Sequence, residues 1–202
     1  MHANDASPPP ALVLASASPR RRSLLAEAGF TVHVHPAAID ERVLPGEEPS
    51  AHVGRLALEK GERVAKEIAG DLETPVIISG DTVVVLDGEI LGKPSDPADA
   101  RAMLARLSDT THEVRSGWCV RRGARVIAGV ETTRIVFRAL TPAEIETYVA
   151  TGEPLDKAGA YGIQGGAAAF VTTIDGDLTN VIGLPVGPVV AAIEELLGRD
   201  ER

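Results

Sequence analysis

The fold is decided by the stretch PVIISGDTVVVLDGEIL, residues 75–91. Residues 75–79 have the pattern of a buried strand, and residues 83–86 and 89–91 flank Asp87-Gly88, a strong signal for a β-hairpin. Between the first two segments stands the polar triplet Gly80-Asp81-Thr82. We therefore expect the buried strand to end just before Asp81 and a hairpin to follow it.

Helices and strands interleave on both sides of this stretch. Strands are expected at residues 11–15, 31–35, 112–122 and 126–138 and within 165–174, and helices at residues 20–28, 49–69, 97–107, 141–152 and 185–197. Residues 112–122 and 126–138 read as a second antiparallel pair around Gly123. The pattern predicts an α/β fold with a mixed sheet, and not a purely parallel doubly wound one.

The length of 202 residues suits a single domain over residues 11–202. Residues 1–10 include three prolines and are expected to form a flexible leader, since they lack the pattern of a signal peptide. No apolar run approaches a membrane span. We therefore expect a cytoplasmic protein.

Composition narrows the classes of partner. With 29 acidic and 20 basic residues, the formal net charge is −9, which argues against broad binding to nucleic acid or to an anionic membrane. The single cysteine, Cys119, excludes an intrachain disulfide and a cysteine-rich zinc site. A basic cluster in such a chain indicates a local pocket for an anion.

Three consecutive arginines, 20–22, form that cluster at the start of the first expected helix. Ser18 is a good N-cap and Pro19 a good first residue, which places the arginines where the helix dipole disfavours cations. A bound phosphate would explain them; the alternative is a solvated basic turn. If the turn is solvated, Arg21→Ala should change the stability of the unliganded protein by less than ~0.5 kcal/mol.

Four further charged residues could carry chemistry. A carboxylate at Asp81, directly after a strand, could hold a metal ion or take a proton from water; the alternative is an ordinary turn. Lys93 could neutralise phosphate charge, and Glu41 could be a second carboxylate for Mg²⁺ or part of a solvated loop. Lys60, within the long helix, has the pattern of a surface lysine.

Residues 152–166 contain five glycines and show neither a helical nor a strand period. A loop of this length in a compact domain is usually functional or disordered, and its apolar content argues against disorder. Tyr161 could pack on a base or sugar, and Gln164 could bond a base edge. The alternative is a cluster of structural turns.

Three motifs carry a family resemblance. They are LASASPRR at residues 14–21, SGDTVV at 79–84 followed by GKP at 92–94, and EPLDKAGAYGIQG at 153–165. In this order and spacing, the chain from Leu12 to Leu196 resembles the Maf family of nucleoside triphosphate pyrophosphatases. The third motif is similar to the signature of the subgroup that acts on dTTP and UTP.

The resemblance implies an elongated mixed sheet with helices forming two lobes around a cleft, as in ITPase-like proteins, and a homodimer. It implies hydrolysis of a nucleoside triphosphate to the monophosphate and pyrophosphate with a divalent metal, Mg²⁺ or Mn²⁺. By motif position Asp81 is the general base, and Asp81 and Glu41 lie at the metal. The positions that match phosphate contacts are Ser16, Arg20, Arg21, Lys60 and Lys93.

Arg21, Thr82 and Gln164 match positions linked to substrate choice. The sibling subgroup acting on 7-methyl-GTP typically has Gln after the catalytic Asp, so Thr82 favours dTTP and UTP, with modified pyrimidine nucleotides as further substrates. The family is also associated with septum formation and cell-division arrest. A nucleotide-binding regulator of division and a pyrophosphatase for purine or 7-methyl-GTP substrates are therefore the alternatives.

Overall fold

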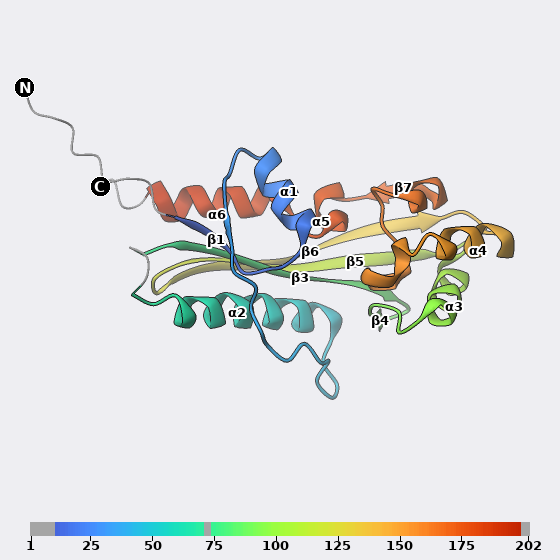
Figure 1. The fold of residues 1–202 in the computed structure, drawn as a ribbon, viewed down its shortest axis with the longest axis horizontal. Coiled ribbons are helices and arrows are strands. Elements are labelled where there is room, and N and C mark those ends of the chain that lie inside the picture. Colours follow the sequence, from blue (N-terminus) through green and yellow to red (C-terminus); the bar gives the residue numbers. More distant parts are fainter. Residues whose placement is uncertain (1–10, 71–73, 199–202) are drawn as a thin grey trace, which may run out of the picture.

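The computed structural model describes residues 11–70 and 74–198, so the predicted leader at residues 1–10 lies outside the described residues. An elongated mixed sheet runs through the molecule (Figure 1). Its strands are β1 (Leu12–Leu14), β2 (His33–Val34), β3 (Val76–Leu86), β4 (Glu89–Leu91), β5 (Thr111–Arg122), β6 (Arg125–Phe137) and β7 (Val171–Asp175). Their order is β2-β1-β3-β5-β6-β7, with β4 paired to β3. The predicted mixed α/β fold is confirmed.

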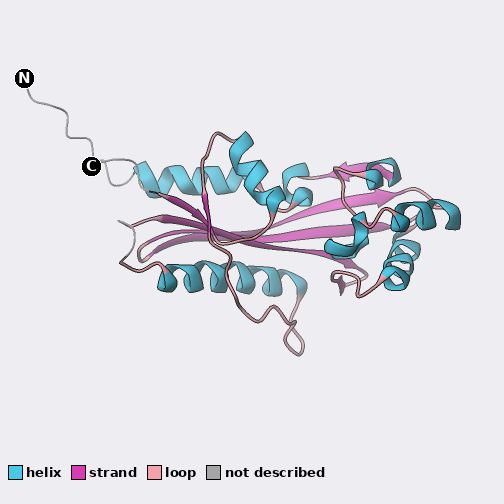
Figure 2. Cartoon of the chain, viewed as in Figure 1, coloured by secondary structure: helices cyan, strands magenta, loops and turns pink. Residues whose placement is uncertain are grey.

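Helices cover both faces of the sheet (Figure 2). They are α1 (Pro19–Glu27), α2 (Pro49–Glu67), α3 (Pro97–Leu107), α4 (Pro142–Ala150), α5 (Leu178–Ile182) and α6 (Val186–Gly198), with short 3₁₀ helices η1 (Glu153–Asp156), η2 (Ala158–Ala160) and η3 (Gly166–Phe170). In Figure 1, α2 lies on one face of the sheet, and α1, α5 and α6 lie on the other. The helices α3 and α4 lie at the end of the sheet where β5 begins and β6 ends. The short α5 and the three 3₁₀ helices were not predicted from the sequence.

The buried strands carry continuous apolar runs because their side chains point in turn to the two faces of the sheet, both of which are covered. Ile77 of β3 packs in one cluster with Val64 of α2. Its neighbour Ile78 packs in another with Ile193 of α6. Successive side chains of a strand point to opposite faces, so a strand covered on both faces needs apolar residues at every position.

The expectation that a strand ends before Asp81 is wrong. β3 continues through the polar triplet, and Asp81 pairs with Gly117 of β5 in a ladder that runs without a break from Val76 to Val85. Pairing with β5 keeps Gly80, Asp81 and Thr82 in the extended conformation. On the other side of β3, β1 pairs only as far as Ile78 and β4 begins at Val84, so the sheet is open beside Asp81.

The predicted turn and caps have the expected geometry. Asp87 and Gly88 have φ of 52° and 83°, which is the backbone of a type I′ hairpin turn. Ser18 caps α1, with its side chain accepting a hydrogen bond from the Arg21 amide. Thr141 and Glu144 form the predicted capping box of α4.

Candidate active site

A cleft of about 650 Å³ opens where β1 and β4 leave β3 unpaired. The segment before α1, one side of α2, the middle of β3 and the glycine-rich segment line it. Every site residue predicted from the sequence lines this cleft: Ser16, Arg20, Arg21, Glu41, Lys60, Asp81, Thr82, Lys93 and Gln164. Five basic and four acidic residues line the cleft. Basic residues therefore outnumber acidic ones here, whereas the whole chain has a formal net charge of −9.

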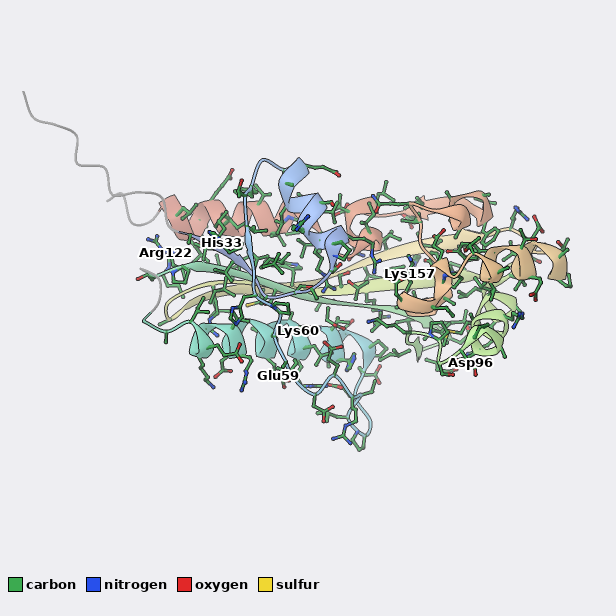
Figure 3. All side chains as sticks on the ribbon, in the orientation of Figure 1. His33, Glu59, Lys60, Asp96, Arg122 and Lys157 are labelled. Atoms are coloured by element: carbon green, nitrogen blue, oxygen red, sulfur yellow. The ribbon has the colours of Figure 1, made fainter. Side chains whose placement is uncertain are left out.

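Lys60 joins the two predicted acidic residues. Its ammonium lies 2.7 Å from Asp81 Oδ1 and 2.7 Å from Glu41 Oε1. The side chain of Lys60 is 8% exposed, so the reading of Lys60 as a surface lysine is wrong. Figure 3 shows Lys60 between α2 and the sheet, whereas Glu59 lies on the outer side of the helix.

Arg21 is held by three hydrogen bonds. Its Nε donates to the Gly183 carbonyl at 2.8 Å, Nη1 to Ser16 Oγ at 3.0 Å, and Nη2 to Thr82 Oγ1 at 3.2 Å. The residue is buried, and this burial lowers the pKa of Arg21, against the charge of Asp81, which raises it. The alternative of a solvated turn is therefore wrong for Arg21, and the small stability change expected for a solvated turn does not apply to it.

Thr82 continues this network into the core. Its hydroxyl lies 2.8 Å from Ser116 Oγ, and the Ser116 hydroxyl donates to the Asn180 carbonyl at 3.1 Å. The Asn180 amide donates to the Val114 carbonyl at 3.0 Å. Because Asn180 belongs to α5, this short helix fixes the Gly183 carbonyl that receives Arg21. Nothing in the sequence pattern singles out Ser116 or Asn180, which meet the site only through the tertiary fold.

Arg20 and Lys93 differ from Arg21 in their surroundings. Arg20 is about one-third exposed, and its guanidinium lies 3.5 Å from Asp156, which brings α1 next to η1 across the cleft. Lys93 is exposed, and no carboxylate of residues 11–70 and 74–198 lies within 4.0 Å of its ammonium. Both cations are therefore accessible to an anion in the cleft.

The glycine-rich segment is ordered into turns and the helices η1 to η3. Gln164 is exposed and lines the cleft, as its predicted role requires. Tyr161 is different, because its ring packs edge-on against His112 and Phe137 and its hydroxyl lies 2.8 Å from His112 Nε2. The Tyr161 ring therefore belongs to the core, and the idea that it stacks on a base is not supported.

A metal site at Asp81 and Glu41 can be judged by its donors. No group of three or more His, Cys, Asp or Glu side chains that could hold a metal occurs in the described part of the chain. The two carboxylates converge on one cationic group, the Lys60 ammonium. Mg²⁺ is commonly held by one or two carboxylates together with substrate phosphates, so these two residues fit that mode of binding and not a closed protein cage.

Known proteins are similar in sequence to this chain over nearly its whole length. A family model described as "Maf-like protein" matches residues 11–196. A protein of Anaeromyxobacter dehalogenans named dTTP/UTP pyrophosphatase is 52% identical over 91% of this chain and 93% of its own length. A protein of Shewanella denitrificans with the same name is 47% identical over 94% and 98%.

One solved structure shows a weaker likeness. It is described as a nucleoside-triphosphatase / dITP/XTP pyrophosphatase from Mycobacterium abscessus and is 14% identical, with a TM-score of 0.40 over 64% of this chain and 75% of its own. A likeness of this size supports no statement about function.

No helix in the described ranges is long and apolar enough to cross a membrane.

Proposed function

Because the chain belongs to the Maf family, we propose that it is a nucleoside triphosphate pyrophosphatase acting on dTTP and UTP. The products are the nucleoside monophosphate and pyrophosphate. Relatives that are about half identical over more than 90% of the chain carry the name dTTP/UTP pyrophosphatase. The chemistry of the cleft agrees with this activity.

The observation that carries the proposal is the placement of cations around one carboxylate. Asp81 is bonded to Lys60, and Arg20, Arg21 and Lys93 line the same cleft. A triphosphate needs several fixed cations to offset its charge, and such preorganised charges favour a transition state in which charge develops. A protein that only bound nucleotide would not need a carboxylate beside the phosphates.

In the reaction, water attacks the α-phosphorus and the bond from that phosphorus to the bridging oxygen breaks. Asp81 orients the water and accepts its proton, while its Oδ1 stays bonded to Lys60. Arg20 and Lys93 bind the leaving pyrophosphate and offset its charge. Arg21 is already fixed by its three hydrogen bonds, so it offers its charge to the substrate with little loss of conformational freedom.

A divalent cation, Mg²⁺ or Mn²⁺, is part of the proposal. Asp81 and Glu41 would hold it together with the substrate, since both carboxylates already face one cationic group. When bound, such an ion polarises phosphoryl oxygens and offsets the charge of the leaving group.

Gln164 is proposed to select the base. Its amide offers one acceptor and two donors, which suit the O4 and N3–H that uracil and thymine share. Cytosine presents an amino group and an unprotonated N3 instead, so an amide held in one orientation rejects it. A polar group left unpaired in a site can carry large discrimination.

Further parts of the proposal concern the protein's setting. We propose a homodimer, as the family resemblance implies, that works in the cytoplasm. The net charge of −9 argues against nucleic acid or an anionic membrane as a partner.

A substrate panel tests the function. Pyrophosphate release is measured with dTTP, UTP, CTP, GTP and 7-methyl-GTP, each with Mg²⁺, with Mn²⁺ and with a chelator. We expect metal-dependent release that is fastest with dTTP and UTP. Equal rates with UTP and CTP would refute the base readout, and absence of pyrophosphate release from every substrate would refute the enzyme.

A further inference from the structure

The residue proposed to select the base lies at the tip of a tight turn. The Gly165 amide donates to the Gly162 carbonyl at 3.1 Å, which makes Ile163 and Gln164 the two central residues of the turn. Ile163 packs against the core cluster that contains Tyr148, whereas Gln164 is exposed in the cleft. The orientation of Gln164 therefore depends on what holds this turn.

One carboxylate, that of Glu153, holds both ends of the turn. Its Oε2 accepts a hydrogen bond from the Gly166 amide at 3.1 Å. Its Oε1 accepts one from the Tyr148 hydroxyl at 2.9 Å, and the same hydroxyl accepts one from the Gly162 amide at 3.0 Å. The residues on the two sides of Ile163 and Gln164 are thus linked through Glu153 and Tyr148.

The same carboxylate explains two of the glycines. A Cβ added at Gly165 would overlap the Glu153 carboxylate, and one added at Gly162 would lie 2.9 Å from Glu153 Oε1. Both contacts are too short for a real Cβ, so these positions accept only glycine while Glu153, and at Gly162 also Lys157, keep their places. The carboxylate fills the inner side of the turn.

Glu153 and Tyr148 are themselves fixed. Tyr148 is buried on α4, and this burial raises the pKa of its hydroxyl well above its ordinary value, so the hydroxyl remains a donor. The main chain of Glu153 accepts a hydrogen bond from the Lys157 ammonium at 2.7 Å. The turn is therefore connected to α4 through Tyr148.

We propose that Glu153 is a positioning residue for base choice, which orients Gln164 by holding the 162–166 turn through its own carboxylate and the Tyr148 hydroxyl. The inference rests on the proposed pyrimidine pyrophosphatase activity and deepens it. Glu153 acts through Gln164 and takes no part in the hydrolytic step. Loss of this support frees the amide to turn or shift, and a displacement of about 1 Å in such a contact can change rates by ~10²-fold.

The test is the ratio of kcat/KM for UTP to that for CTP. Glu153→Gln places an NH₂ group opposite either the Gly166 amide, which can only donate, or the Tyr148 hydroxyl, whose proton then loses its acceptor. In either orientation, one of the two hydrogen bonds that the carboxylate accepts is lost. We expect the ratio to fall about tenfold while kcat with UTP stays within about threefold of wild type. Glu146→Gln is the matched control, because Glu146 pairs with Arg101 at the outer surface of α4, and it should leave the ratio unchanged.

A double-mutant cycle separates positioning from general loosening of the fold. In a Gln164→Ala background, Glu153→Gln should cause no further fall in the ratio, because interacting residues are not additive. A merely structural role would lower the rates with both nucleotides together and leave the ratio intact. Tyr148→Phe removes the other tie and should lower the ratio in the same direction, and it carries the test if Glu153→Gln does not fold.

The outcomes are distinct. If the wild type prefers UTP and the Glu153→Gln or Tyr148→Phe variant keeps that preference, the positioning inference is overturned and the proposed function stands. An equal fall of the ratio with and without Gln164 also overturns it. If the wild type hydrolyses UTP and CTP alike, the base readout fails and the inference fails with it.

Discussion

Replacing Arg21 by alanine should destabilise the unliganded protein, even though the residue lies in a site for substrate. Its guanidinium is buried and donates to Gly183, Ser16 and Thr82. These bonds join α1, β3 and the residue that follows α5. Their loss should therefore lower the free energy of unfolding as well as weaken substrate binding.

The loss of stability on Arg21→Ala can be worked out from the groups to which Arg21 is hydrogen-bonded. Three hydrogen bonds at about 1 kcal/mol each give about 3 kcal/mol. Ser16 Oγ keeps the bond from the Ser18 amide, and Thr82 keeps its bond to Ser116, so neither hydroxyl is left without a partner. Removing a charge that burial disfavours offsets part of the loss. We expect a net loss of about 2–3 kcal/mol, which lowers Tm by roughly 5–10 °C in a chain of this size.

The assay is thermal unfolding without nucleotide, followed by circular dichroism. Arg20→Ala is the matched control, because Arg20 is adjacent, partly exposed and paired with Asp156 at 3.5 Å. Such an exposed pair contributes about 0.5 kcal/mol or less, so Tm should fall by less than about 2 °C. If Arg21→Ala and Arg20→Ala shift Tm equally, the buried network does not support the fold as argued.

Three further predictions concern catalysis, metal and pH. Asp81→Asn should keep the fold and lower kcat by ~10²–10⁴-fold, and a folded variant with near-normal turnover would remove Asp81 from the mechanism. Chelation should abolish pyrophosphate release, and Glu41→Gln should raise the Mg²⁺ concentration needed for half-maximal rate; an unchanged metal titration would exclude Glu41 from the metal site. Burial lowers the pKa of His112 to about 4, below its unfolded value, so the unfolded state binds the proton first and stability falls as pH decreases from about 6.5 towards 4. Between pH 7 and pH 5 this group should contribute a loss of about 2 kcal/mol, seen as a fall in Tm that is smaller in His112→Gln; an identical fall in the variant would contradict the assignment.

The case of Lys60 shows what a sequence can and cannot reveal. Lys60 lies seven residues after Val53 and four before Val64, on the same apolar stripe of α2. A lysine on the buried stripe of an amphipathic helix is a signal for a buried charge with a partner, and this signal was present in the sequence. The identity of the partners, Asp81 and Glu41, was not, because they lie on a strand and a loop that only the fold brings to α2.

The polar triplet Gly80-Asp81-Thr82 is a case in which the local sequence predicts the wrong structure. Its residue types indicate the end of a strand, and local preference alone gives no reason to extend β3 through it. Pairing with β5 overrides that preference, since the strand gains main-chain hydrogen bonds along its whole length. The hydrogen-bonded chain from Arg21 through Thr82 and Ser116 to Asn180 is likewise tertiary, whereas the hairpin turn and the helix caps are local and could be predicted.

The unbroken ladder between β3 and β5 leaves the molecule without a hinge at Asp81. The register runs from Val76↔Arg122 to Val85↔Glu113 with no shift, so a sharp bend of the sheet at Asp81 would break main-chain hydrogen bonds between β3 and β5. Changes in the width of the cleft therefore fall to residues 35–48, which carry Glu41 and form neither helix nor strand. We therefore expect entry of the substrate and exit of pyrophosphate to depend on residues 35–48, while the paired strands β3 and β5 keep their places.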